Sequence, residues 1–192
     1  MFMDAIAVNF SPIINLSDEQ FFQLCQQNEL IRFERNSDGT LVLMPLVGGL
    51  TSNRNANLTY QLGMWNQDEI GIAFDSSAGF TLPNRAVRSP DASWLRRSQW
   101  DALTQEQKER FAPVCPDFVA ELRSDTDCLE RLRNKMQEYQ DNGTKLGWLI
   151  DLQNRQVEIY RPSQEVEIIE SPHTLSGETV LPGFVLNLEP IW

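Results

Sequence analysis

The stretch from Pro116 to Asp151 constrains the fold more than any other part of the chain. It contains the apolar run 118–122, a polar turn, an amphipathic segment and a second apolar run, 146–150. A short strand, a helix and another short strand in this order are typical of a β-α-β unit, whose two strands lie parallel beneath the helix. We therefore expect an α/β (α+β) protein with a central mixed β-sheet flanked by helices.

The helix of this unit shows the expected amphipathic spacing. Its apolar face is formed by residues three or four positions apart, Leu129, Leu132, Met136 and Tyr139. Asp127 followed by Glu130 fits a capping box at the start of the helix. Asn142-Gly143 supplies a left-handed end.

Two charged side chains in the unit need an explanation. Strand alternation places Glu121 and Arg123 on one face with Val119, and a covered carboxylate is costly unless a cation, a metal or hydrogen bonds compensate it. Lys135, at the border of the apolar helix face, can aim its ammonium at that strand. A surface lysine whose stem lies along the packing surface fits the same spacing, so both interpretations stay open.

Composition favours one domain spanning residues 1–192, because 41% hydrophobic side chains suffice for one full core. The cysteines, Cys25, Cys115 and Cys128, are odd in number and widely spaced, which predicts free thiols in a reducing cytoplasm and no zinc site. The segment Met1 to Phe10 does not resemble a secretory signal, and no apolar run is long enough to cross a bilayer. We expect no membrane partner.

The remaining segments place an N-terminal helix and a β-hairpin before the central unit. Ser17 caps the first helix to about Glu29, and Thr51 or Ser52, after the break at Gly48-Gly49, caps a second to about Gln67. Polar helical turns are expected in 98–110, and the segment 181–184 should dock on the body. Strands are expected at 31–35, 41–44, 70–75, 79–82, 89–95, 156–160 and 165–169, the last two as antiparallel additions.

Several classes of catalytic site can be set aside. The single histidine, His173, lies in a loop of turn composition, and the chain has no Gly-x-Ser-x-Gly elbow, P-loop or dinucleotide motif. Hydrolysis by carboxylates and a hard cation remains, because Mg²⁺ needs only one or two carboxylates plus waters and phosphate oxygens. Asp91 and Glu121 would suit such a site on neighbouring strands, with Lys135 or Arg123 stabilising developing charge or orienting the water.

Pro90-Asp91, then Glu121-Leu122-Arg123 and Lys135 resemble the PD-(D/E)xK nuclease superfamily. More closely, the chain resembles the Uma-type family of restriction-endonuclease-like proteins. The shared landmarks cover nearly the whole chain in order: Phe33-Glu34-Arg35, Asp38-Gly39, Met44-Pro45, Ser89-Pro90-Asp91, Pro116 to Glu121, Ser124, Lys135, Tyr139, Gly143, Trp148 to Asp151 and Leu181 to Phe184.

The resemblance implies a restriction-endonuclease-like fold in which Asp91 and Glu121 bind Mg²⁺ or Mn²⁺ and Lys135 acts from the helix. Two residues depart from the family pattern. Arg123 occupies the strand position of the superfamily lysine and stays protonated, so it can stabilise charge but cannot act as a base. Asn55 stands where many members carry a histidine, which leaves a hydrogen-bonding group only.

Glu34 shares a strand face with Arg32 and is a candidate further acid of the site. An exposed hairpin residue paired with Arg32 or Arg35 explains Glu34 equally well. Asp117 and Asp151 stand at strand ends, where short carboxylates accept hydrogen bonds from backbone donors.

The expected activity is metal-dependent hydrolysis of nucleic-acid phosphodiester bonds, with DNA as the partner. The alternative is a binding or regulatory module that kept the nuclease fold and lost turnover. A net charge of −11 speaks against unaided nucleic-acid binding, since that affinity comes mostly from cations. A homodimer would concentrate four cations that flank Asp91 in sequence, Arg85, Arg88, Arg96 and Arg97, around the cleft.

Overall fold

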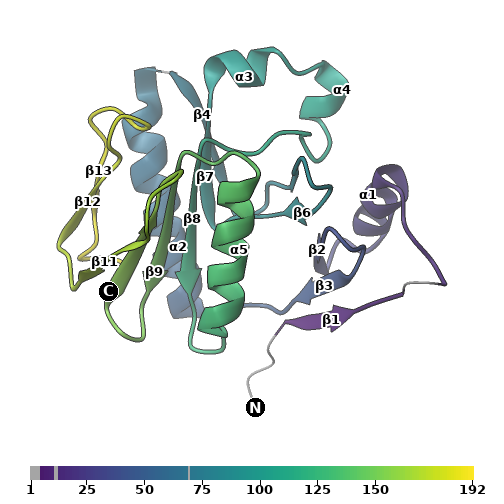
Figure 1. Ribbon diagram of the computed structural model, residues 1–192, viewed down its shortest axis with the longest axis horizontal. Helices are drawn as coiled ribbons and strands as arrows, with labels where there is room; N and C mark the ends of the chain where they lie inside the picture. Colours follow the sequence, from purple (N-terminus) through teal and green to yellow (C-terminus); the bar gives the residue numbers. More distant parts are fainter. Residues whose placement is uncertain (1–4, 11–12, 69) are drawn as a thin grey trace.

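A six-stranded sheet forms the centre of the protein in a computed structural model that describes residues 5–10, 13–68 and 70–192 (Figure 1). Its strands run in the order β11-β10-β9-β8-β7-β4. Their bounds are Glu167–Glu170, Gln156–Tyr160, Leu146–Asp151, Phe118–Arg123, Ala92–Arg96 and Gly71–Asp75. The β8 and β9 strands are parallel and every other neighbouring pair is antiparallel, which confirms the β-α-β unit and the mixed sheet.

Helices cover both faces of this sheet. The α5 helix (Leu129–Asp141) packs on one face, where Val119 of β8 joins a core with Met136 and Tyr139. The α2 helix (Gly49–Trp65) lies on the opposite face, where the alternate residues of β8 meet Leu58 and Leu62. The predicted alternation along β8 is therefore correct, and Glu121 faces α5.

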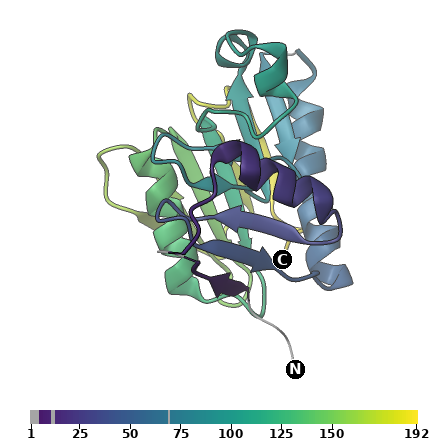
Figure 2. The same ribbon diagram turned by 90° about the vertical axis from the view of Figure 1, so that its right-hand side faces the viewer.

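A second, five-stranded sheet lies beside the first, in the order β1-β3-β2-β6-β5 (Figure 2). Its strands are Ile6–Val8, Leu41–Met44, Arg32–Arg35, Val87–Arg88 and Phe80–Thr81. The α1 helix (Asp18–Gln27), capped by Ser17 as predicted, covers it, and Phe21 packs against Leu41 and Val87 in a separate small core. The predicted N-terminal helix and hairpin are thus confirmed.

The remaining elements are short. The expected turns in 98–110 form α3 (Arg97–Asp101) and α4 (Gln105–Lys108), and a 3₁₀ turn spans Asn66–Asp68. A two-stranded ribbon near the C-terminus pairs β12 (Thr174–Ser176) with β13 (Val185–Asn187). Leu181 and Phe184 are buried in the core on the α2 face, so this segment docks on the body as expected. No helix in the described part of the chain is long and apolar enough to cross a membrane.

Two predicted helix starts were wrong. The α5 helix is capped by Cys128 without a side-chain hydrogen bond, because the Asp127 carboxylate accepts hydrogen bonds from the amide and hydroxyl of Ser124 instead. The α2 helix starts at Gly49 with Gly48 as its cap, so the glycine pair begins the helix and does not separate it from the hairpin. The end of α5 at Asn142-Gly143 is as predicted, with Gly143 at a φ of 116°.

Candidate active site

Asp91 and Glu121 meet because their strands are neighbours. The register pairs Ala92 of β7 with Ala120 of β8, which places Asp91, one residue before β7, next to Glu121. The backbone amide of Leu122 donates to Oδ2 of Asp91 at 2.8 Å, and Nδ2 of Asn55 on α2 donates to Oδ1 at 2.8 Å. Both oxygens of Asp91 are thereby oriented by hydrogen bonds.

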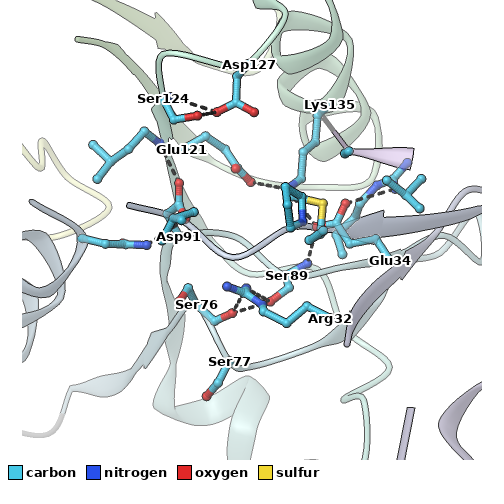
Figure 3. A pocket seen from close by; sticks show the side chains of 18 of the residues that line it. Arg32, Glu34, Ser76, Ser77, Ser89, Asp91, Glu121, Ser124, Asp127 and Lys135 are labelled. Carbon is cyan, nitrogen blue, oxygen red and sulfur yellow. Dashed lines mark hydrogen bonds and ion pairs between the residues drawn. The ribbon is translucent and has the colours of Figure 1, made fainter. Parts of the chain in front are cut away.

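Lys135 reaches these carboxylates from α5 (Figure 3). Its Nζ lies 2.8 Å from Oε1 of Glu121 and 2.8 Å from Oε1 of Glu34, and its side chain is only 11% exposed. The hydroxyl of Tyr139, one helical turn further on, also donates to Oε1 of Glu121, at 3.0 Å. Lys135 is therefore a largely buried member of the cluster, and the surface-lysine interpretation was wrong.

Glu34 belongs to the same cluster although it comes from the smaller sheet. It is buried, accepts a hydrogen bond from the backbone amide of Ser89 at 2.9 Å, and lies 3.4 Å from Nη1 of Arg88. Arg88 in turn pairs with Glu138 on α5. The interpretation of Glu34 as an exposed hairpin residue was wrong, since Arg35 pairs with Asp18 instead.

Burial sets the protonation of the acids. It raises the pKa of Glu121 to about 8, helped by the nearby charges of Asp91 and Glu34 and opposed by Lys135. Burial likewise raises the pKa of Asp91. The pKa of Glu34 is lowered, because Lys135 and Arg88 together outweigh the effect of burial.

The pKa of Lys135 shifts in the direction opposite to the effect of its burial. Burial alone would lower the pKa of its ammonium, but the carboxylates of Glu121 and Glu34 raise that pKa above the ordinary value. Lys135 is therefore protonated at neutral pH. In this arrangement it can donate hydrogen bonds and stabilise negative charge, but it cannot act as a base.

Arg123 is not brought to the cluster. Its Nη1 donates to Oδ2 of Asp151 at 2.8 Å and its Nε to the carbonyl of Asp127 at 3.3 Å, at the C-terminal ends of β8 and β9. Asp151 also accepts from the amides of Gln153 and Asn154, as expected of a turn-forming carboxylate. The structure thus engages the Arg123 guanidinium with Asp151 and the Asp127 carbonyl, and not with the acids that it was expected to serve.

The four arginines that flank Asp91 in sequence do not gather around the cleft. Arg88 lies there, but Arg96 binds Asp117 at the other end of β7, and Arg97 pairs with Asp101 on α3. Arg85 lies near Asp18 beside the smaller sheet. The expected concentration of cations is therefore wrong for three of the four, because each has an acidic neighbour elsewhere.

The donor set suits a hard cation held mainly by substrate and water. Across residues 5–10, 13–68 and 70–192, no three side chains of Asp, Glu, His or Cys gather so as to hold a metal ion by themselves. Two carboxylates are nevertheless enough for Mg²⁺, which keeps several waters. Lys135 and Tyr139 both use Oε1 of Glu121, so its Oε2 accepts nothing from the described residues. The buried Oδ1 of Asn55, next to Asp91, also lacks a described partner.

Sequence reasoning missed the part that three residues play in this site, although it had placed one of them, Arg88, at the cleft. Tyr139 was assigned to the apolar helix face, yet its position four residues after Lys135 also directs its hydroxyl at Glu121. Arg88 and Glu138 support Glu34 through contacts 50 and more residues apart in sequence. No local sequence pattern indicates these long-range contacts of Arg88 and Glu138.

The site opens into a large cleft. The cleft is lined by both sheets and by α2 and α5, and its volume is about 1860 Å³. Pockets for small molecules usually measure roughly 300–1,000 Å³, so a larger substrate fits this space better. Asp91, Glu121, Glu34 and Lys135 all line it.

A mixed sheet between helices, with two acids on neighbouring strands and a lysine beside them, defines a protein of the restriction-endonuclease-like fold class. A crystal structure described as "a putative nuclease belonging to DUF820" from Anabaena variabilis is similar, with a TM-score of 0.74 and 20% sequence identity. The match covers 92% of this chain and 97% of that one. No curated protein matches the chain. The Uma2 family, described as "Putative restriction endonuclease", matches residues 18–189, and the chain belongs to this family.

Proposed function

We propose that this protein is a Mg²⁺- or Mn²⁺-dependent endonuclease that hydrolyses phosphodiester bonds in DNA. One observation carries the proposal: Asp91, Glu121 and Lys135, from a strand start, a strand and a helix, converge in one cleft. The description of the family to which the chain belongs, "Putative restriction endonuclease", and that of the similar crystal structure, "a putative nuclease", support this class of activity. The size of the cleft suits a polymer.

The two carboxylates would hold the cation. When bound, the divalent cation would polarise the phosphodiester and lower the pKa of a water molecule, so that hydroxide is available near neutral pH. Asn55 and the Leu122 amide orient the carboxylate of Asp91, and Tyr139 orients that of Glu121. Neither acid then has to reorganise during the reaction.

The positively charged side chains of the site would stabilise negative charge on the substrate. Lys135 stays protonated between Glu121 and Glu34, so its ammonium would stabilise the negative charge that develops on the phosphoryl oxygens. Arg88 and the Ser89 amide fix Glu34, which keeps Lys135 in place. Glu34 is on this account a positioning residue.

A plasmid-nicking assay tests the proposal. Supercoiled DNA incubated with the protein and Mg²⁺ or Mn²⁺ should be nicked, and a chelator should stop the reaction. Asp91→Asn and Glu121→Gln should abolish nicking without lowering the melting temperature, because burial disfavours the ionised form of both acids and the amides keep the shape of the side chains. Glu130→Gln, an exposed acid on α5, is the matched control and should nick like the wild type.

The same variants decide against the alternative, a binding module without turnover. An active enzyme should release or absorb heat when titrated with Mg²⁺, and Asp91→Asn should remove that heat. Absence of nicking and of metal heat, together with DNA binding that survives both substitutions, would contradict the endonuclease proposal and support the binding module.

A further inference from the structure

Arg32 differs from Lys135 and Arg88, the other cations near the acids, because it forms no ion pair with a carboxylate of the described residues. Its guanidinium donates to the carbonyl of Ser76 and, at 3.3 Å, to Oγ of Ser89. Both acceptors are uncharged. Among the described residues, no carboxylate lies within 4.0 Å of the Arg32 guanidinium, so it forms no direct ion pair, although its charge favours the ionised form of Asp91.

The other cations nearest the acids are already paired. Lys135 contacts Glu34 and Glu121, and Arg88 contacts Glu34 and Glu138. The cluster with Asp91 thus contains more acids than cations. A phosphate approaching it needs further positive charge, and Arg32 is placed to supply it.

The position of Arg32 follows from β2. It precedes Glu34 by two residues, so both side chains leave the strand on the same face. Glu34 points to Lys135, while Arg32 lines the same cleft and extends toward the Ser76 loop (Figure 3). Ser89, which anchors it, is two residues before Asp91 and also donates to the Ser76 carbonyl, at 2.7 Å.

The anchoring leaves the guanidinium free to bind a ligand. Both hydrogen bonds use Nη2, so the hydrogens on Nε and Nη1 have no partner within the described residues. These three N–H hydrogens can donate charge-assisted hydrogen bonds to phosphate oxygens.

We propose that Arg32 binds a backbone phosphate of the nucleic acid, beside the phosphodiester held at Asp91 and Glu121. This inference rests on the proposed function and adds a substrate contact to it. Arg32 is here a binding residue, separate from the groups that act on the reacting atoms.

The salt dependence of DNA binding tests the inference. Binding of a labelled short duplex is measured by fluorescence anisotropy, in chelator so that no cleavage occurs, between about 50 and 200 mM NaCl. Loss of one phosphate contact should reduce the slope of log K against log salt by about 0.9 in Arg32→Ala. Arg32→Lys should keep most of the slope but bind more weakly, because a lysine ammonium keeps the charge but cannot both hold the Ser76 carbonyl and Ser89 and present the separate Nε and Nη1 donors.

Arg97→Ala is the matched control, since it removes the same charge from an exposed arginine on α3, outside the cleft. Its slope should equal that of the wild type. In the cleavage assay, Arg32→Ala should raise KM and leave kcat unchanged, with no change in melting temperature. If Arg32 served only to hold Ser76 and Ser89 in place, Arg32→Ala would instead lower the melting temperature and kcat.

The outcomes separate the two proposals. A wild type that binds and cleaves DNA, with an unchanged slope and KM in Arg32→Ala, would overturn the role of Arg32 and leave the endonuclease standing. A wild type that neither binds nor cleaves would overturn both. A slope reduced equally in Arg97→Ala would show a general charge effect and reject the specific contact.

Discussion

At the scale of single residues, one ammonium group holds the site together. Lys135 compensates two carboxylates that burial would otherwise penalise, and it is itself held by them. A buried pair contributes little net stability, but removal of one partner is strongly destabilising because a buried charge is left alone. The site is therefore sensitive to the loss of Lys135 in a way that a surface lysine would not be.

Lys135→Met should lower the free energy of unfolding by roughly 3–5 kcal/mol in the absence of metal. Urea denaturation at pH 8 measures this. Lys145→Met, an exposed lysine just before β9, should change it by less than about 0.5 kcal/mol. Equal effects of the two substitutions would show that Lys135 is not paired as described.

At the scale of elements, an ion pair between Arg123 and Asp151 joins the C-terminal ends of β8 and β9, and its side chains are not partners of Asp91 or Glu121. Arg123 and Asp151 close neighbouring strand ends, with the Asp151 side chain almost fully buried. Arg123 occupies the strand position at which the superfamily pattern has a lysine, so the chain has no lysine at this point of β8. Lys135 contacts Glu121 from α5 instead.

Arg123→Met should separate stability from turnover. Asp151 keeps its other donors, so we expect a loss of about 1–3 kcal/mol in the free energy of unfolding. The cleavage rate per folded molecule should stay within about twofold of the wild type, because a contact outside the site adds nothing to transition-state binding. A rate loss above about tenfold at full folding would return Arg123 to the catalytic machinery.

The elements that sequence reasoning recovered are those with a strong local period. The β8, α5 and β9 elements follow from apolar spacing alone, and Ser17 with Gln20 specifies its helix start locally. The β1, β12 and β13 strands have three residues each, too few to show alternation. At Asp127, two local motifs compete for one carboxylate, and the turn with Ser124 prevails over the helix cap.

The site was predictable in part for the same reason. Asp91 and Glu121 follow from neighbouring strands, whereas Glu34 enters through the packing of the small sheet against α5. The pairing of Arg88 with Glu138 likewise depends on tertiary structure. Composition indicated a shortage of cations, and the structure shows that most of the flanking arginines are committed to nearby acids.

At the scale of the whole molecule, the buried acids couple stability to pH. The pKa of Glu121 is near 4.5 when exposed and about 8 in the folded protein. Between these values the folded state holds a proton that the unfolded state has released, so stability falls as pH rises. The raised pKa of Asp91 acts in the same direction.

The metal-free protein should therefore lose stability from pH 5 to pH 8, by at most about 1.4 kcal/mol per pH unit for Glu121. Urea unfolding in chelator across this range measures the slope. Glu121→Gln should flatten it, and Glu130→Gln should not. Parallel curves for the wild type and Glu121→Gln would show that Glu121 ionises normally.

The two contacts of Lys135 span two sheets, since Glu121 belongs to the large sheet and Glu34 to the small one. These two ion pairs thus also connect the large sheet to the small one. Loss of packing in the core of the small sheet, for example at Phe21, would shift Glu34 and misplace the Lys135 ammonium, although Asp91 and Glu121 themselves stay unchanged. The packing of the small sheet against the large one therefore also sets the position of the Lys135 ammonium.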